Sequence, residues 1–238
     1  MILALLLCIE TATSVCSVAL AGDGALLSLK ETSDKYPHSA VITLFIAGVL
    51  ESAGVEPHAL DGIAVSKGPG SYTGLRIGVA TAKGLCYSLD KPLIAISTLQ
   101  SMAAGMRDIR DATGDDRTGL LFCPMIDARR MEVYSALFDE TGKEVREALA
   151  EILDEKSFRE YLQKQKVLFA GDGTGKFRAL LEKNPNALFL EDFYPSAKSM
   201  CRLAEERFLS GEFEDLAYFE PFYLKDFIAG KPWVKGLR

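Results

Sequence analysis

The stretch of sequence that decides the fold is Lys67-Gly68-Pro69-Gly70-Ser71-Tyr72-Thr73-Gly74-Leu75-Arg76-Ile77-Gly78. It follows an apolar segment over 62–66, typical of a buried strand, and precedes an Ala- and Gly-rich segment over 79–89 that predicts a helix. A strand, a glycine-rich turn and a helix start gather backbone N–H groups and the positive end of a helix dipole, which suits an anion such as a phosphate.

The spacing of the glycines matches neither of the common phosphate-binding motifs. No Gly-Lys-Ser/Thr closes the stretch as in a Walker loop, and glycines at 68, 70, 74 and 78 do not fit the dinucleotide fingerprint. A structural alternative stays open, in which Gly74 and Gly78, four residues apart on one helix face, let another helix approach closely.

The composition is that of a soluble globular protein with room for one large or two ordinary domains. The chain has 238 residues, of which 48% are hydrophobic and 25% charged. The net charge is −6, from 27 Lys and Arg against 33 Asp and Glu. An acidic chain lacks the broad basic field expected of a surface that binds a nucleic acid by itself.

The cysteines predict a reducing, cytoplasmic setting. No two of them form a C-x-x-C pair and most lie in apolar surroundings, so we expect buried thiols and neither a disulfide framework nor a zinc site. The apolar start over 1–9 has no positive n-region and ends at Glu10, so it predicts a core strand and no membrane span. The five cysteines are Cys8, Cys16, Cys86, Cys123 and Cys201.

The order of the predicted elements indicates an α/β fold. Three strands over 1–9, 15–20 and 25–31 precede a helix over 38–52, a strand over 62–66, a helix over 75–89, a strand over 93–97 and a helix over 98–110. The polar segment over 108–118 is the best boundary, which gives domains 1–110 and 111–238. The second domain is predicted to hold strands over 119–127, 132–139, 143–152 and 167–170, with helices over 155–163 and 197–210.

The helices over 38–52 and 75–89 lack the polar face of a surface helix. The inner stretch 40–50 contains a single polar residue, Thr43. Both sides of such helices must be covered, either by a partner or by other parts of this chain, and the sequence leaves both possibilities open.

The string from Gly68 to Gly78 resembles the hallmark of the bacterial TsaB (YeaZ) family, and similar features recur over 126–134, 195–197 and 221–224. The resemblance covers nearly the whole chain to about Leu224. It implies two actin-like lobes of the ASKHA, ribonuclease H-like class, and a role in making threonylcarbamoyladenosine next to the anticodon of certain tRNAs. It also implies a catalytic paralogue of the TsaD/Kae type.

Positions that carry chemistry in the paralogue are changed in this chain. Thr98 and Met102 stand where the paralogue has a metal-binding His-x-x-x-His pair, and neither suits a hard or borderline divalent ion. Ser196 stands where the paralogue places an Asp, and an acidic pair is replaced around Ser14-Val15. We therefore expect no catalytic residue and no bound metal in this chain. Its two histidines, His38 and His58, lie in no metal-binding spacing.

The resemblance implies a non-catalytic scaffold that dimerises with a TsaD-like paralogue through the two apolar helices. It further implies a TsaE-like small ATPase as partner, tRNA contact only through the complex, no membrane, ATP or ADP at the interface of the assembled complex, and a two-fold homodimer when alone. We assign nucleotide or partner binding to Thr11, Gly68, Gly70, Ser71, Thr73 and Arg76, and the interface to Val41, Leu44, Phe45, Val49, Leu75, Val79, Ala82 and Cys86.

Two other functions stay open. One is a stand-alone actin-like ATPase or phosphotransferase, and the other is a glycoprotease-like hydrolase. The segment from Gly171 to Lys176 superficially resembles a phosphate loop, but Ala170 and Phe177 occupy positions where the Walker spacing needs Gly and Ser or Thr. The hydrolase is poorly supported, because the chain has no nucleophile in a Gly-x-Ser-x-Gly frame.

Overall fold

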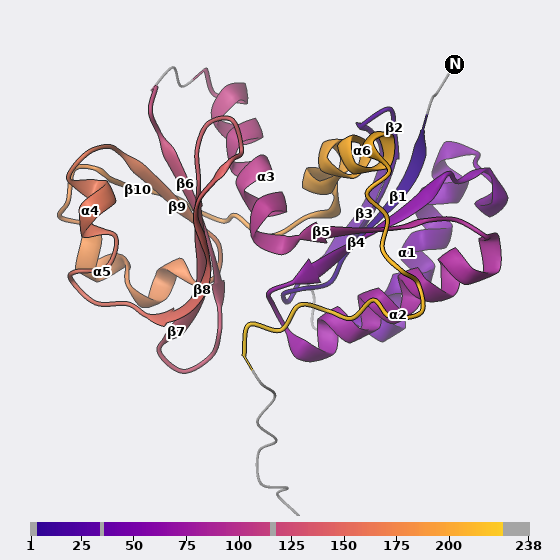
Figure 1. The fold of residues 1–238 in the computed structure, drawn as a ribbon, viewed down its shortest axis with the longest axis horizontal. Coiled ribbons are helices and arrows are strands. Elements are labelled where there is room, and N and C mark those ends of the chain that lie inside the picture. The colour runs from indigo at the N-terminus through magenta and orange to yellow at the C-terminus, as the bar shows by residue number, and fades with distance from the viewer. Residues whose placement is uncertain (1–3, 34–35, 115–117, 226–238) are drawn as a thin grey trace, which may run out of the picture.

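The computed structural model describes residues 4–33, 36–114 and 118–225, which form two lobes side by side (Figure 1). The first lobe is built on a five-stranded sheet of order β3-β2-β1-β4-β5. The pairs β3–β2 and β2–β1 are antiparallel, whereas β1–β4 and β4–β5 are parallel. The strands are β1 (Leu5–Glu10), β2 (Cys16–Gly22), β3 (Ala25–Thr32), β4 (Gly62–Gly68) and β5 (Leu93–Ser97).

The second lobe repeats this topology. Read from its antiparallel edge, its sheet has the order β8-β7-β6-β9-β10, with β8–β7 and β7–β6 antiparallel and β6–β9 and β9–β10 parallel. The two lobes therefore have the same sheet topology, although the sequence shows no repeat. The strands are β6 (Leu121–Asp127), β7 (Glu132–Phe138), β8 (Glu144–Ile152), β9 (Val167–Ala170) and β10 (Ala187–Leu190).

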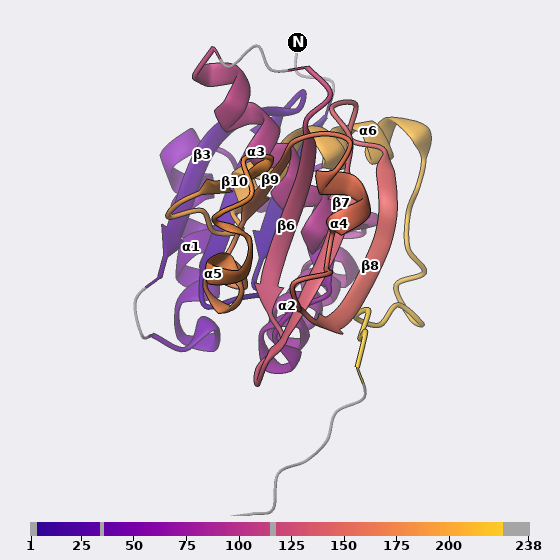
Figure 2. The same ribbon diagram turned by 90° about the vertical axis from the view of Figure 1, so that its left-hand side faces the viewer.

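The helices cover the sheets and join the lobes. Figures 1 and 2 show α1 and α2 on one face of the first sheet, α6 on the other, and α3 between the lobes. The α-helices are α1 (His38–Ala53), α2 (Tyr72–Leu89), α3 (Thr98–Ala112), α4 (Arg159–Leu162), α5 (Arg178–Leu181) and α6 (Cys201–Ser210). Short 3₁₀ turns are η1 (Pro57–Ala59), η2 (Thr174–Lys176) and η3 (Ala197–Met200).

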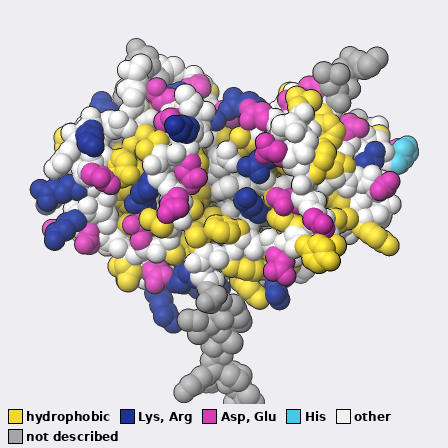
Figure 3. All heavy atoms as spheres, viewed as in Figure 1, with side chains coloured by type: hydrophobic (Ala, Val, Ile, Leu, Met, Phe, Trp, Pro, Cys, Tyr) yellow, Lys and Arg dark blue, Asp and Glu magenta, His cyan; other side chains and the backbone are white. Residues whose placement is uncertain are grey.

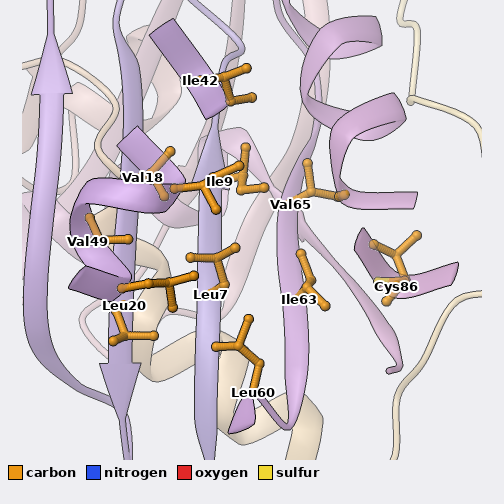
Figure 4. Packing of buried hydrophobic residues seen from close by; sticks show 14 of the residues in the cluster. Leu7, Ile9, Val18, Leu20, Ile42, Val49, Leu60, Ile63, Val65 and Cys86 are labelled. Atoms are coloured by element: carbon orange, nitrogen blue, oxygen red, sulfur yellow. The ribbon is translucent and has the colours of Figure 1, made fainter. Parts of the chain in front are cut away.

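The core of the first lobe explains why β1 is apolar from Leu5 to Ile9. Leu7 and Ile9 point to the side of α1 and α2, where they pack with residues such as Ile42 (Figure 4), whereas Leu6 and Cys8 pack on the side of α6. A strand covered on both faces reads as a continuous hydrophobic run without alternation. The predicted start of this strand at residues 1–3 lies outside the described residues.

Most predicted elements are present, with differences in the second half. Strands β5 and β9 have the predicted bounds, whereas α4 is much shorter than the helix expected over 155–163. Its start is delayed because the Asp154 carboxylate accepts the N–H groups of Lys156 and Ser157 at 2.8 and 3.0 Å, and Phe158 has a left-handed φ of 61°. The helix expected over 197–210 is divided into η3 and α6, and the sequence predicted neither α5 nor β10.

The expected division into 1–110 and 111–238 assigns α6 to the second domain, whereas α6 packs against the first sheet. Its residues Leu203 and Ala204 share a cluster with Ala19 and Ile94. The chain thus crosses to the second lobe after α3 and returns to the first lobe before its C-terminal part.

The glycine-rich stretch lets a backbone segment lie directly on α2. A Cβ at Gly74 would be 2.1 Å from the Thr11 carbonyl oxygen, and a Cβ at Gly78 would be 2.2 Å from Thr11 Oγ1. A Cβ at Gly70 would be 2.4 Å from the carbonyl oxygen of Ala12. The close approach expected of these glycines is therefore present, but the segment that approaches is the β1–β2 turn and not another helix.

The segment over 211–225, which we call the C-terminal strap, runs back along the first lobe (yellow in Figure 1). Its Glu214 N–H donates to Leu93 of β5 at 2.9 Å, and its Phe222 N–H donates to Lys67 of β4 at 2.7 Å. Lys83 of α2 donates to the Phe219 carbonyl at 3.1 Å. The strap thereby binds both a sheet edge and α2.

Replacing Gly74 with Ala tests the close approach of the β1–β2 turn. The new methyl group meets a backbone oxygen that cannot rotate away, so we expect Gly74→Ala to lower the free energy of unfolding by about 1–3 kcal/mol. The matched control is Gly84→Ala in the same helix, where nothing lies within 4 Å of the new Cβ. Higher helix propensity should stabilise this control by up to about 1 kcal/mol. Urea denaturation measures both, and a stabilised Gly74→Ala would contradict the packing described here.

Candidate functional site

A cleft of about 460 Å³ lies where the two lobes and the strap meet, and we call it the interlobe cleft. The first lobe contributes the β1–β2 turn and the start of α2, and the second contributes the β6–β7 turn and the residue after Gly171. The end of the strap passes below the junction of the lobes in Figure 1 and completes the wall. The lining residues used below are Gly70, Ser71, Thr73, Asp127, Arg129, Arg130, Asp172 and Lys225.

The predicted binding residues divide between the cleft wall and the core behind it. Gly70, Ser71 and Thr73 line the cleft, whereas Thr11 and Gly68 are buried behind it. Gly68 has a φ of 113°, and a Cβ there would be 2.5 Å from the Phe222 carbonyl oxygen, so this glycine accommodates the strap.

Some of the backbone N–H groups at the start of α2 already have hydrogen-bond partners within the chain. The Ser71 N–H donates to the Ala12 carbonyl at 2.6 Å, and Ser71 Oγ accepts the Gly74 N–H at 3.3 Å as the N-cap. These contacts use two of the donors that an anion at the helix start would need. Ser71 is thus the N-cap of α2, and Thr73 is exposed beside it.

Arg76 lies on the outside of α2 and contacts an aromatic pair. Its guanidinium carbon is 4.5 Å from the centroid of the Tyr72 ring, and this ring lies 4.9 Å from that of Tyr223 in the strap. The ring pair attaches the strap to α2, and the cation–π contact holds Arg76 over the Tyr72 ring within α2. In this structure Arg76 therefore supports the wall of the cleft from outside.

The two carboxylates of the cleft hold backbone turns. Asp172 accepts the N–H of Asp127 at 2.9 Å, and Asp127 in turn accepts the N–H of Arg129 at 2.6 Å and pairs with Lys176. Burial raises the pKa of Asp172, and the Asp127 charge adds to the effect. Both groups are thus engaged in fixing the β6–β7 turn to the Gly171–Gly175 turn.

The basic residues of the cleft, Arg129, Arg130 and Lys225, were not predicted as site residues, although the motif over 126–134 includes the two arginines. Arg129 and Arg130 form the tip of the β6–β7 turn, with left-handed φ angles of 65° and 51°. Neither has an ion pair within 4.0 Å among the described residues. Lys225 of the strap pairs with Glu132 and thereby attaches the strap to the second lobe. A turn over 128–131 was predicted between β6 and β7, but the glycines that usually mark left-handed positions are missing, so the sequence did not indicate its left-handed conformation.

The structure corrects the list of interface residues. Val49, Leu75, Val79, Ala82 and Cys86 are at most 4% exposed and lie on the inner sides of α1 and α2, so they cannot face a partner in this fold. The helices lack polar faces because their inner sides cover the sheet while small apolar residues occupy their outer sides.

The outward-facing surface of the two helices is defined by Leu44, Ala47, Ala80, Gly84 and Tyr87, and we call it the α1–α2 outer face. Leu44 is 67% exposed and Tyr87 is 84% exposed. Val41 and Phe45 are half-buried beside it. Of the eight predicted interface residues, only Leu44 lies fully on this surface.

Three of the positions compared with functional residues of the paralogue, Thr98, Met102 and Ser196, are buried, whereas Ser14 is exposed at the interlobe cleft. Thr98 and Met102 are 0% exposed, and Ser196 is held by Glu31 at 2.6 Å. No group of three or more His, Cys, Asp or Glu side chains in the described part of the chain could hold a metal ion. His38 Nε2 lies 2.8 Å from the Thr13 carbonyl oxygen and must donate to it, so that nitrogen cannot serve as a base. Within 4–33, 36–114 and 118–225 no helix is long and apolar enough to cross a membrane.

Glu10, at the end of β1, is a charged residue in a fully buried setting. Its Oε1 accepts the Ala12 N–H at 2.6 Å, while Oε2 has no hydrogen-bond partner among the described residues. Burial raises the pKa of Glu10 to about 7, although hydrogen bonds from Ala12, Ser66 and Thr11 oppose the shift. Glu10 lies under the β1–β2 turn, so its protonation affects the segment that packs on the glycines of α2.

Comparison with known proteins places this geometry in a family. A family model described as TsaD, tRNA N6-adenosine threonylcarbamoyltransferase, matches residues 31–233. The tRNA threonylcarbamoyladenosine biosynthesis protein TsaB of Escherichia coli K12 is 32% identical over 231 residues, covering 95% of this chain and 96% of that protein. TsaB of Bacillus subtilis 168 is 30% identical, covering 97% and 98%. The crystal structure of YeaZ from Pseudomonas aeruginosa superposes with a TM-score of 0.73 at 26% identity, covering 93% of this chain and all of that one.

The chain belongs to the TsaB (YeaZ) family. The matches extend over almost its full length, and the expected pair of actin-like α/β lobes is confirmed by the structural likeness.

Replacing Glu10 with Gln tests the buried carboxyl through its pH dependence. A pKa of about 7 in the folded state against 4.5 for the ordinary group means that the folded protein binds the proton more tightly. The contribution of Glu10 to stability is therefore complete below pH 4.5 and is lost as the pH rises through 7, by roughly 3 kcal/mol. Denaturation from pH 5 to 8.5 should show this decline in the native protein and a flatter profile in Glu10→Gln. Glu56→Gln, at an exposed glutamate, should follow the native profile, and a native-like slope in Glu10→Gln would refute the assignment.

Proposed function

We propose that this member of the TsaB family is a non-catalytic subunit in the synthesis of threonylcarbamoyladenosine in tRNA, and that it binds a TsaD-like catalytic paralogue through the α1–α2 outer face. The names of its relatives support the pathway. The observation that carries the proposal is the α1–α2 outer face itself, because two neighbouring helices expose apolar side chains with almost no charge among them.

The outer face has the properties of a docking surface. The segment from His38 to Leu50 carries no acidic or basic side chain apart from His38, although nine of its thirteen positions are exposed or half-buried. Leu44 and Tyr87 project from a background of Ala and Gly, which allows a second pair of helices to approach closely. Exposed apolar surface of this kind marks interaction sites on soluble proteins. A paralogue of the same fold offers equivalent helices, so the pairing is a pseudo-two-fold dimer, replaced by a homodimer when this chain is alone.

The interlobe cleft supports a scaffold better than a phosphotransferase. An enzyme that transfers phosphate needs carboxylates to hold Mg²⁺ on the phosphate chain. Asp127 and Asp172, the acidic residues used to fix the cleft wall, are already hydrogen-bonded to backbone N–H groups. We therefore place ATP or ADP at the interface of the assembled complex, which includes a TsaE-like small ATPase. With a net charge of −6, the chain meets tRNA only through that complex, in the cytoplasm.

Leu44→Glu tests the docking surface. Placing a carboxylate in an apolar interface loses the burial of a leucine and leaves a charge without a partner. We expect at least about tenfold weaker binding to the TsaD-like paralogue, with a matching loss of tRNA modification in a reconstituted reaction. Ile152→Glu is the matched control, because Ile152 is 66% exposed on the second lobe. Ile46 and Val79 are unsuitable, since at 8% and 4% exposure a glutamate there would unfold the first lobe.

Titration calorimetry of the purified partners measures the affinities, with circular dichroism to verify folding. Native affinity in Leu44→Glu, or an equal loss in Ile152→Glu, would refute the proposed surface.

A turnover assay separates the scaffold from the enzyme alternatives. The isolated chain, given ATP and magnesium or a peptide substrate, should show no turnover near the rate of about 1 per second typical of a slow enzyme. Arg76→Ala should weaken assembly of the complex, because it removes the cation–π contact on Tyr72, the ring against which Tyr223 of the strap packs. If the isolated chain turns over either substrate at such a rate and Arg76→Ala abolishes the activity, the chain is an enzyme and the scaffold proposal fails.

A further inference from the structure

A second pocket of about 310 Å³ shares no lining residue with the interlobe cleft. It lies between α3 and α6, at the upper end of the junction between the lobes in Figure 1, and we call it the α3–α6 pocket. The turn between β7 and β8 closes it from the second lobe. Its polar lining residues are Gln100, Arg107, Glu140, Thr141, Arg202 and Glu206.

Arg107 stands in this pocket without a carboxylate partner. One Nη donates to the backbone carbonyl of Glu140 at 3.2 Å, but Nε is buried and has no hydrogen-bond partner among the described residues. No ion pair within 4.0 Å involves Arg107 in the part of the chain that the structure describes. The backbone closes over its guanidinium, because a Cβ at Gly142 would lie 2.7 Å from Nη1.

A second guanidinium, that of Arg202, faces the same space from α6. Its nearest carboxylate oxygen belongs to Glu206, 3.9 Å from Nε, and 55% of its side chain is exposed. Burial lowers the pKa of Arg107 and the positive charge of Arg202 lowers it further, while the charges of Asp108, Glu206 and Asp111 oppose the shift. Both guanidinium-bearing residues line the same pocket, and an anion between them would favour their charged forms.

The two carboxylates that line the pocket equal the two guanidinium groups in number, but neither forms a close ion pair with Arg107. Glu140 pairs with Arg110 at 3.3 Å and accepts the Leu120 N–H at 3.4 Å. Glu206 lies 3.9 Å from Arg202 Nε and has no ion pair within 4.0 Å with Arg107 among the described residues. On the face shown in Figure 3, Lys and Arg side chains lie interspersed with Asp and Glu. The amide oxygen of Gln100 accepts from Arg207 at 3.0 Å, which leaves its NH₂ group as a further donor at the wall.

We propose that the α3–α6 pocket binds a phosphate group between the guanidinium groups of Arg107 and Arg202. Guanidinium forks present several N–H donors at once and suit the tetrahedral oxygens of phosphate. The group is either free phosphate or a phosphate of an RNA backbone. Bound there, it joins α6 of the first lobe to the β7–β8 turn of the second, and so stabilises the arrangement of the lobes. This inference does not depend on the proposed docking surface.

The test uses the full chain and inorganic phosphate at constant ionic strength. We expect saturable binding by calorimetry at millimolar phosphate and a rise in melting temperature, because a ligand that binds only the folded state stabilises it. Arg202→Gln should weaken binding at least tenfold while leaving the fold intact, because this side chain is largely exposed. Arg178→Gln, at a surface arginine of α5 with 46% exposure, is the control and should bind normally.

Two further measurements keep the proposal decisive. The Nε–H resonance of Arg107 should shift on adding phosphate, which reports the pocket without any substitution. A short RNA added in competition distinguishes the sources, since displacement of phosphate by RNA assigns the site to a nucleic-acid backbone, and binding of phosphate alone assigns it to a small ion. The absence of saturable binding to either ligand, or an equal loss in Arg178→Gln, would overturn the proposal.

Discussion

The contact between the β1–β2 turn and α2 is the constraint on which the rest of the structure depends. Backbone oxygens of Thr11 and Ala12 occupy the space that side chains would fill at Gly70 and Gly74. This brings the axis of α2 close to the sheet. The inner residues of α2 are therefore buried in the core, and its outer residues form the exposed surface. The same approach buries Glu10 and forms one wall of the interlobe cleft. This one packing contact thus shapes both a wall of the interlobe cleft and the exposed surface of α2.

The fold could be predicted from the sequence wherever local patterns were decisive. Strands such as β5 and β9 are short apolar runs with clear boundaries, and Gly54 ends α1 in the left-handed conformation expected of a C-cap. Prediction failed where contacts between residues far apart in the sequence determine the structure. Strand β10 exists because it pairs with β9, and α6 returns to the first sheet across the whole second lobe. The sequences of β10, with 4 residues, and of α6, with 10 residues, carry no pattern that identifies the strand or sheet that each contacts.

The candidate site was predicted only in outline, for two physical reasons. Glycine spacing indicates that something approaches α2, but it does not identify the approaching segment as Thr11-Ala12 or assign Gly68 to the strap. Apolar helices also hide which side faces the sheet, because Val49 and Leu44 are equally hydrophobic although one is buried and the other exposed. The aromatic motif over 222–223 was recognised as a family feature, yet its contact with Tyr72 required the three-dimensional structure.

Two lobes of one topology, with a cleft between them, usually serve to open and close around a ligand, but here both ends of the junction are tied. At the cleft, the strap joins the lobes through Lys225 and Glu132, and the carboxylates of Asp127 and Asp172 fix backbone turns. At the other end, Arg107 of α3 binds the β7–β8 turn, and a phosphate in the α3–α6 pocket would add Arg202 to that connection. Restricting lobe motion disfavours a catalytic cycle that needs closure. It favours a subunit whose task is to present the α1–α2 outer face in one orientation, since a preorganised surface loses less entropy on binding.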